Sequence, residues 1–206
     1  MKIGIVTERS TAGRNKDVVD VLEKSGHELI NVGMRSEDDP VLTFTQTGFI
    51  AALLLNYKLA DFVVGGCGNG QGFLNAAMQF PNVFCGLIRN EIDGWLFAQI
   101  NGGNCVSLVL GQEYGFASNE KLRFILERLF SVETGSGYPK ERKEPQDKLR
   151  AELAEMSAGT HLRIDECIKN INYGFVKTCI EHPNFKAIFK QAEISRELKE
   201  CLDKGW

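Results

Sequence analysis

The chain has 206 residues, a formal net charge of −3 and 43% hydrophobic residues. A chain of this length buries roughly 70% of its unfolded surface, so we expect one substantial domain with an appendage rather than two full domains. The slightly acidic balance gives no electrostatic basis for binding nucleic acid. The six cysteines are scattered without a Cys-x-x-Cys pair, so the sequence signals neither a zinc site nor a redox pair and predicts reduced core thiols.

The first two thirds of the chain alternate short apolar runs with amphipathic segments. We predict strands at residues 2–6, 27–32, 61–64, 83–88 and 106–110. We predict helices at residues 14–25, 42–58, 73–80, 92–100 and 120–130, the first ended by Gly26 and the last capped at Ser118-Asn119. Such alternation implies right-handed crossovers. Residues 1–131 are therefore predicted to form a three-layer α/β/α Rossmann-like domain around a five-stranded parallel sheet.

The chain changes character after residue 131. Residues 132–150 are rich in Gly, Pro and charge, which predicts a linker or arm. In residues 151–206, Ile164, Ile168 and Phe175 fall on one helical face, which predicts a small helical extension that caps the sheet domain or a partner subunit. The first strand begins at Lys2, and the longest apolar run is too short to cross a bilayer. We therefore expect a cytoplasmic protein that does not bind membranes.

The most informative stretch is residues 61–77, where an apolar run enters five glycines around Cys67 and an apolar helix follows. Such a turn aims backbone N–H groups at one point, which favours an anion. It lacks the third glycine of the dinucleotide fingerprint, and Gln71 and Gly72 replace the Lys and Ser/Thr of a nucleotide P-loop. What remains is a loop that holds a phosphate or oxyanion beside a thiol, which suits proton abstraction next to a carbonyl.

The segment from Cys67 to Gly72, Cys-Gly-Asn-Gly-Gln-Gly, followed by Asn-Ala-Ala at 75–77, resembles the Cys-Gly-Thr-Gly-x-Gly…Ala-Ala-Asn segment of type B ribose-5-phosphate isomerases and the related galactose-6-phosphate isomerases. Residues 1–5 and 26–33 are similar to the first strand, helix and second strand of that family. The resemblance implies a sugar-phosphate aldose–ketose isomerase that works through a cis-enediolate. It further implies no metal or organic cofactor, and a homodimer or homotetramer with each site between subunits.

Cys67 is the expected proton-transfer base, with a thiolate favoured by the start of the following helix. The backbone N–H groups of Gly68, Gly70 and Gly72 are expected to hold the enediolate oxygen. Asn69 stands where the family has threonine and could donate to the same oxygen. Two alternatives stay open: Cys67 as a buried cysteine in a tight turn, and Asn69 as a residue that adopts left-handed backbone.

Glu8 and Arg9 replace the Asp-His pair that the family carries after its first strand. We expect Arg9 to clamp phosphate, because a guanidinium pairs with phosphate in a fork, and Glu8 to accept sugar hydroxyls. The alternative is an exposed ion pair on a loop. In a parallel sheet the loops at the carboxyl ends of the strands share one edge, so Glu8, Arg9, Cys67 and Asn69 can converge.

The chain departs from the family at Ile100, which stands where a histidine helps to open the sugar ring. Asn101 keeps the neighbouring amide and is expected to bind substrate. The phosphate arginines of the family have no clean match. Arg142, Lys143 and Arg150 lie in that region at altered spacing, and of these Arg142 is the substrate-binding candidate, with a surface charge as the alternative. We therefore expect isomerase chemistry on an altered sugar. Two alternatives remain open, a non-catalytic sugar-phosphate-binding protein of the same fold and an enzyme with a thiol nucleophile.

Overall fold

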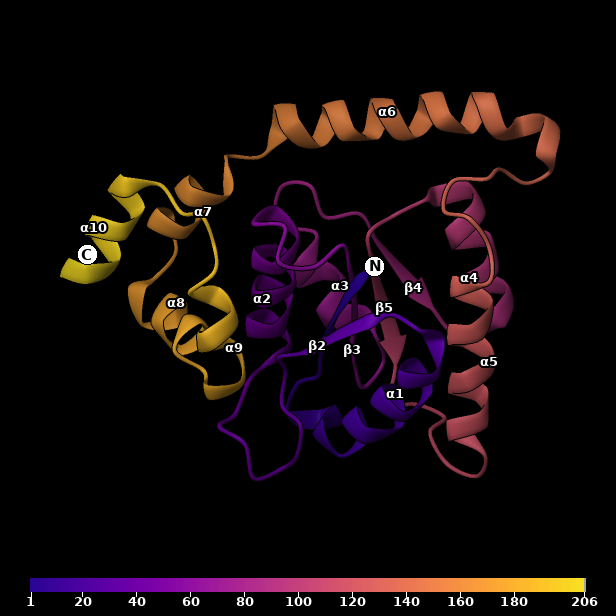
Figure 1. The fold of residues 1–206 in the computed structure, drawn as a ribbon, viewed down its shortest axis with the longest axis horizontal. Helices are drawn as coiled ribbons and strands as arrows, with labels where there is room; N and C mark the ends of the chain where they lie inside the picture. Colours follow the sequence, from indigo (N-terminus) through magenta and orange to yellow (C-terminus); the bar gives the residue numbers. More distant parts are fainter. Residues whose placement is uncertain (206) are drawn as a thin grey trace.

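The computed structural model describes residues 1–205 and contains a five-stranded parallel sheet covered by helices on both faces (Figure 1). The strands are β1 (Lys2–Val6), β2 (Glu28–Asn31), β3 (Phe62–Cys67), β4 (Cys85–Ile88) and β5 (Cys105–Val109). They lie in the order β2-β1-β3-β5-β4, and all four pairings are parallel. The predicted Rossmann-like α/β/α fold is thereby confirmed.

Alternate residues of the central strands pack into two separate hydrophobic cores, one on each face of the sheet. Val63 of β3 packs with α2 (Phe44–Asn56) and α3 (Gln71–Ala77) on one face. Its neighbour Val64 packs on the other face with α1 (Asn15–Leu22), the π-helical turn η3 (Phe97–Asn101) and α5 (Ser118–Phe130), and α4 (Glu91–Leu96) lies against α5. Successive strand side chains point to opposite faces, so a strand buried on both sides reads as a continuous apolar run. This explains why the strands were visible in the sequence.

Several element boundaries differ from the sequence prediction. β3 continues to Cys67, so the cysteine ends the strand instead of lying within the turn. The loop after β1 contains a 3₁₀ helix, η1 (Arg9–Arg14), and a second one, η2 (Glu23–Ser25), leads to Gly26, whose φ is 73°. The predicted cap at Ser118 is wrong, because its hydroxyl accepts the N–H of Gly115 while Ala117 occupies the N-cap position.

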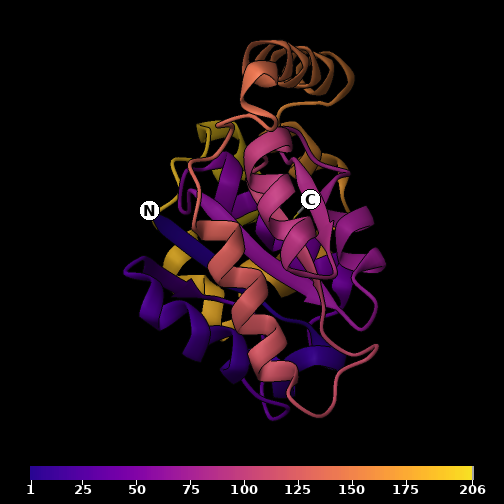
Figure 2. The same ribbon diagram turned by 90° about the vertical axis from the view of Figure 1, so that its right-hand side faces the viewer.

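The carboxyl-terminal region is helical earlier than expected. A short 3₁₀ turn, η4 (Lys140–Arg142), leads into α6 (Lys143–Thr160), so the predicted boundary at residue 150 falls inside a helix. Pro145 lies in the first turn of α6, where its missing N–H has no intrahelical partner to lose. Figures 1 and 2 show α6 crossing one end of the molecule, apart from the sheet layers.

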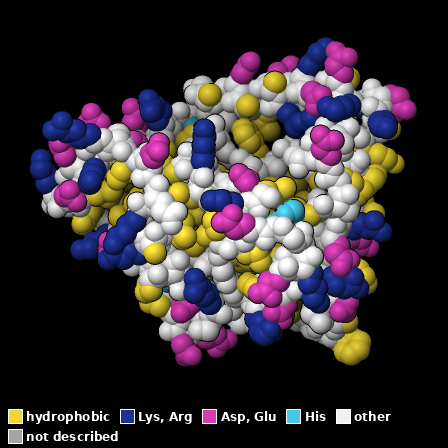
Figure 3. Space-filling view, in the orientation of Figure 1, with side chains coloured by type: hydrophobic (Ala, Val, Ile, Leu, Met, Phe, Trp, Pro, Cys, Tyr) yellow, Lys and Arg dark blue, Asp and Glu magenta, His cyan; other side chains and the backbone are white. Residues whose placement is uncertain are grey.

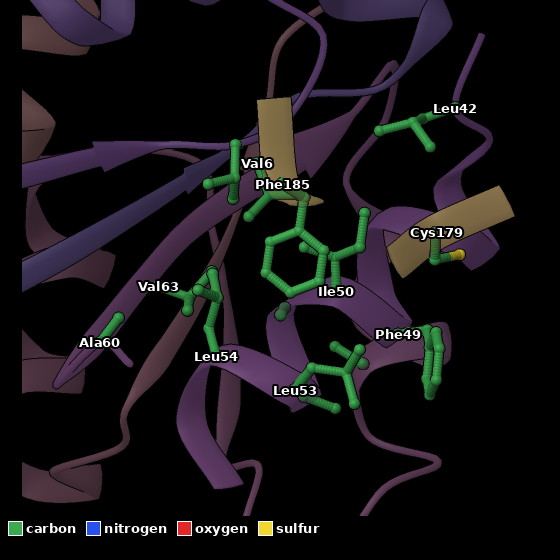
Figure 4. Packing of buried hydrophobic residues seen from close by; sticks show 14 of the residues in the cluster. Val6, Leu42, Phe49, Ile50, Leu53, Leu54, Ala60, Val63, Cys179 and Phe185 are labelled. Atoms are coloured by element: carbon green, nitrogen blue, oxygen red, sulfur yellow. The ribbon is translucent and has the colours of Figure 1, made fainter. Parts of the chain in front are cut away.

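The remaining helices pack on the outer side of α2, which Figure 1 shows beside α8 and α9. They are α7 (Ile164–Asn170), α8 (Tyr173–Ile180), α9 (Pro183–Phe189) and α10 (Arg196–Lys204). Phe185 is fully buried and points inward among Val6, Ile50 and Leu54 (Figure 4). The extension therefore shares a core with the sheet domain. Within residues 1–205, every helix is too short or too polar to cross a lipid bilayer.

Candidate active site

The loop that carries Cys67 begins at the last residue of β3. Cys67 is 7% exposed and pairs in register with Val109 at the carboxyl end of β5. Its carbonyl oxygen accepts the N–H of Leu110 at 3.1 Å and that of Gly70 at 3.3 Å. The thiol is thus fixed at the carboxyl edge of the sheet, where ligands of open α/β folds bind.

Gly70 shapes the turn. Its φ of 78° lies in the left-handed region, and a Cβ built on it would meet Leu87 Cδ1 at 2.4 Å. The buried hydroxyl of Ser107 donates to the Gly70 carbonyl at 2.6 Å and ties the loop to β5. Because the Gly70 N–H already donates to the carbonyl of Cys67, Gly70 sets the backbone rather than offering a donor to an anion, contrary to our expectation.

Asn69 lies against the thiol. The Sγ of Cys67 donates to Asn69 Oδ1 at 3.7 Å, and the backbone N–H of Gln71 donates to the same oxygen at 3.0 Å. Asn69 is not among the residues of 1–205 with a positive φ, so the left-handed alternative does not hold. With Oδ1 occupied, the Nδ2 group is the part of this amide that can donate to a substrate oxygen.

The first loop reaches the Cys67 loop through Ser10. Glu8 is 6% exposed, and its carboxylate accepts the backbone N–H of Ser10 at 3.0 Å and also the Ser10 hydroxyl. A Cβ built on Gly68 would lie 3.7 Å from Ser10 Oγ. Ser10, which is exposed, therefore lies between the buried carboxylate and the glycine that follows Cys67. Glu8, expected to bind sugar hydroxyls directly, instead holds this serine.

Arg9 is exposed at the same edge, and its backbone N–H donates to Leu42 O at 2.9 Å. The segment that leads to Leu42 is braced by the carboxyl-terminal extension. Asn184 donates to the carbonyl of Gly33 at 2.9 Å and to Asp39 Oδ2 at 2.8 Å. The nitrogen Nε2 of His182 donates to the carbonyl of Pro40 at 2.9 Å. The extension thus supports the loops around Arg9 from outside.

Asn101 and Arg142 lie at the opposite edge of the sheet. Asn101 ends η3 (Phe97–Asn101), a turn of π-helix that returns the chain to the amino end of β5. The five residues of β5 separate that end from Cys67 by about 13 Å at the usual strand rise. Arg142 is exposed, and its segment is anchored to η3 because the Gly137 N–H donates to Gln99 O at 3.0 Å. One chain does not bring these two residues to the thiol.

A groove of about 350 Å³ separates α6 from the amino edge of the sheet. Its lining is mainly apolar, and Figure 3 shows hydrophobic side chains gathered in the hollow beneath α6. Ile100, Leu153 and Met156 all line it. Ile100, which stands where the resembled family has its ring-opening histidine, is therefore part of an apolar surface in this chain. A larger hollow of about 790 Å³ lies along the open edge of β2 and contains none of the predicted site residues.

The other buried cysteines are unsuited to base catalysis. Burial raises the pKa of the Cys179 thiol to about 12. Burial, together with a hydrogen bond to Cys85, also raises the pKa of Cys105. Both stay neutral thiols, as the sequence predicted for core cysteines. Within residues 1–205, no group of three or more His, Cys, Asp or Glu side chains is arranged to hold a metal ion.

Sequence reasoning missed Ser10 and Ser107. Ser107 sits within an apolar strand, where a single buried hydroxyl signals a hydrogen-bond partner but does not identify it. A signal for Ser10 was present, because Glu8 and Thr11 have the spacing of a reciprocal cap, in which each side chain accepts the backbone N–H of the other residue. The structure has this reciprocal cap, with Glu8 N donating to Thr11 Oγ1 at 3.3 Å, and the Glu8 carboxylate also accepts the Ser10 N–H at 3.0 Å.

Comparison with known proteins places this site in a family. The family described as Ribose/Galactose Isomerase matches residues 3–142. A ribose-5-phosphate isomerase from Vibrio parahaemolyticus is 36% identical, with a TM-score of 0.92 over 100% of this chain and 99% of that chain. A 4-deoxy-L-threo-5-hexosulose-uronate ketol-isomerase is 35% identical, with a TM-score of 0.91 over 99% of this chain and 98% of that chain.

Shorter structures share the fold of the sheet domain. The ribose-5-phosphate isomerase B of Clostridium thermocellum is 20% identical, with a TM-score of 0.64 over 77% of this chain and 99% of that chain. No curated protein matches the chain. The family match covers more than half of the sequence and includes Cys67, the glycine turn and the first loop. This chain belongs to the ribose/galactose isomerase family of enzymes.

Proposed function

We propose that this chain is an aldose–ketose isomerase of an acidic sugar, with a sugar phosphate as the first candidate substrate and Cys67 as the base. The observation that carries the proposal is the position of the thiol, buried at the carboxyl edge of β3 and in contact with Asn69 Oδ1 at 3.7 Å. The thiolate takes the proton from the carbon beside the carbonyl and returns it to the adjacent carbon. Between these steps the sugar is an enediolate.

The enediolate oxygen needs donors that are in place before the reaction. We assign this role to the N–H of Gly68, the Nδ2 group of Asn69 and the N–H of Gly72. Gly72 is the second residue of α3, where helix N–H groups have no intrahelical acceptor. Removing one such donor costs about 10²–10³ in rate in well-studied enzymes. Arg9 is the proposed clamp for the acidic group of the sugar.

The acidic group has two candidates, a phosphate and a carboxylate. A phosphate is suggested by the family. A carboxylate is suggested by the similar ketol-isomerase, whose alignment covers 99% of this chain and whose name identifies a uronate as its substrate. Both anions pair with a guanidinium in the same way. Ile100 in the apolar groove supports a substrate that enters in its open-chain form, because an alkyl side chain cannot open a sugar ring.

The remaining predicted residues act across a subunit interface in this proposal. Asn101 and Arg142 lie at the edge of the sheet opposite Cys67, so they can reach a substrate at Cys67 only from a second copy. Cys67→Ala and Asn101→Ala proteins are each expected to be inactive. Mixed after unfolding and refolding, they should recover about a quarter of wild-type activity, because half of the dimers then carry one intact site. Failure to recover activity would show that Asn101 does not act across the interface on the Cys67 of a second copy.

The test of the reaction is proton exchange in heavy water followed by NMR, with a panel of pentose phosphates, hexose phosphates and open-chain uronates. We expect one substrate to exchange the hydrogen beside its carbonyl with the wild-type protein and to stop exchanging with Cys67→Ala. Binding without exchange of any sugar would identify a non-catalytic binding protein instead. A covalent adduct on Cys67 by mass spectrometry would identify a nucleophile.

A further inference from the structure

Ser10 lies where the first loop meets the Cys67 loop. Its hydroxyl donates to the Glu8 carboxylate and lies 3.7 Å from a Cβ built on Gly68. Ser10 is exposed whereas Glu8 is only 6% exposed. A sugar that reaches Cys67 therefore meets the serine oxygen, and the carboxylate lies behind it. Because the Ser10 proton is committed to Glu8, the serine oxygen is free to accept a proton from a ligand.

An aldose–ketose interconversion moves two protons. One passes between adjacent carbons, which is the task of Cys67 in the proposed function. The other passes between the two oxygens on those carbons, because the hydroxyl of the aldose becomes the carbonyl of the ketose. Few groups near the thiol can carry the second proton. Arg9 stays protonated in proteins, and neither the first loop nor the Cys67 loop contains a histidine.

We propose that Ser10 is a catalytic residue that carries the oxygen-bound proton, with Glu8 as the group that receives and returns it. The proposal rests on the isomerase function proposed above. In the enediolate, the hydroxyl of the sugar donates its proton to Ser10 Oγ while the Ser10 proton passes to Glu8. The same path then runs in reverse onto the neighbouring oxygen. The proton changes oxygen, Ser10 and Glu8 return to their starting states, and no other reactant is consumed.

Buried Glu8 suits this role because its second oxygen is held in place. Oε2 accepts the Ser10 backbone N–H at 3.0 Å, and Glu8 N donates to Thr11 Oγ1 at 3.3 Å. The carboxylate thus cannot swing toward the sugar without breaking the start of η1. Once the original Ser10 proton has passed to Glu8, the proton that Ser10 received from the sugar can turn about the Cβ–Oγ bond from one sugar oxygen to the next. A fixed carboxylate behind a mobile hydroxyl makes a proton relay.

The two proton transfers can be measured separately. Exchange at the carbon beside the carbonyl of the starting aldose needs only Cys67, whereas conversion to the ketose also needs transfer between the oxygens. We therefore compare wild type, Ser10→Ala, Ser10→Thr and Ser25→Ala in heavy water, with the sugar that exchanges best. Ser25 is a matched control, because it is also exposed and its hydroxyl donates to a backbone carbonyl, that of Leu22, at 2.5 Å.

In Ser10→Ala we expect exchange into the aldose to persist while ketose formation falls by about 100-fold, the size of a lost acid–base group. Ser10→Thr keeps a hydroxyl and should restore conversion, and Ser25→Ala should match wild type. The Ser10 variant keeps the backbone N–H that caps η1, so the loop should stay folded. An equal fall in exchange and conversion, or no change in either, would overturn the relay. If wild type itself exchanges no sugar, the isomerase function fails first and the relay falls with it.

Discussion

Gly70→Ala tests how tightly the Cys67 loop is built. The native φ of 78° costs an alanine about 1–2 kcal/mol of left-handed strain. The added methyl group would also meet Leu87 Cδ1 at 2.4 Å, and moving Leu87 off its rotamer costs about 0.5–1.5 kcal/mol. The sum is about 1.5–3.5 kcal/mol, which corresponds to a fall in Tm of about 3–14 °C for a chain of this size. Thermal and urea unfolding followed by circular dichroism measures it.

Gly26→Ala is the matched control for this variant. Gly26 has almost the same φ, 73°, but a Cβ built there meets nothing within 4 Å. The free energy of unfolding of the Gly26→Ala protein should therefore fall only by the backbone strain, about 1–2 kcal/mol. Gly70→Ala should lose more free energy of unfolding than Gly26→Ala because its methyl group crowds Leu87. Adding Leu87→Ala should recover part of this crowding cost, because the two side chains compete for one space. If Gly70→Ala and Gly26→Ala are equally stable, the crowding argument is refuted and the loop is looser than described.

Other predictions concern the carboxyl-terminal extension. Phe185→Ala should lower the free energy of unfolding by about 3–5 kcal/mol, because it empties a fully buried site, whereas Phe116→Ala, at a side chain 105% exposed, should change it by less than about 0.5 kcal/mol. Burial raises the pKa of Asp165, but hydrogen bonds from Ser195 and Tyr57 outweigh it and leave the pKa below its ordinary value. A lowered native pKa stabilises the fold above the unfolded pKa of about 4, and this contribution is lost as the pH falls below it. Asp165→Asn should therefore be less stable than wild type at pH 7, with a smaller difference at pH 3 in urea unfolding.

Much of the sheet domain could be predicted from the sequence, because its strands are buried on both faces and their apolar runs are bounded by Gly and Pro. β1 was predicted with its observed ends, Lys2–Val6. The failures have local causes. Residues 143–150 look like a linker because Pro145 and many charges dominate them, yet proline is compatible with the first turn of α6. Whether such a segment is a linker or the start of a helix depends on where the helix begins, and composition does not reveal that position.

The turn after Cys67 was predictable from the sequence, whereas the hydrogen bonds around it were not. The spacing of glycines around Cys67 signals the turn, because few other residues fit such backbone. Some N–H groups of that turn are already used in hydrogen bonds, such as the one from Gly70 N–H to the carbonyl of Cys67. Only the folded chain defines these bonds, and so only the fold shows which N–H groups remain free. The pairing of Glu8 with Ser10 likewise redirects a side chain that the sequence assigned to the sugar. Residue types indicate which chemistry is available, and the hydrogen-bond partners in the folded chain decide which atoms are left to take part in it.

Helix α2 limits how short this protein can be. Residues 47–54 are buried without interruption, so the helix has no side that tolerates water. The sheet takes one side, and the extension that contains Phe185 takes the other. A chain cut before α7 would present a bare apolar helix and should aggregate rather than fold. The smallest independently folding unit therefore includes the extension, and a relative without it must make one side of this helix polar or cover it with another chain.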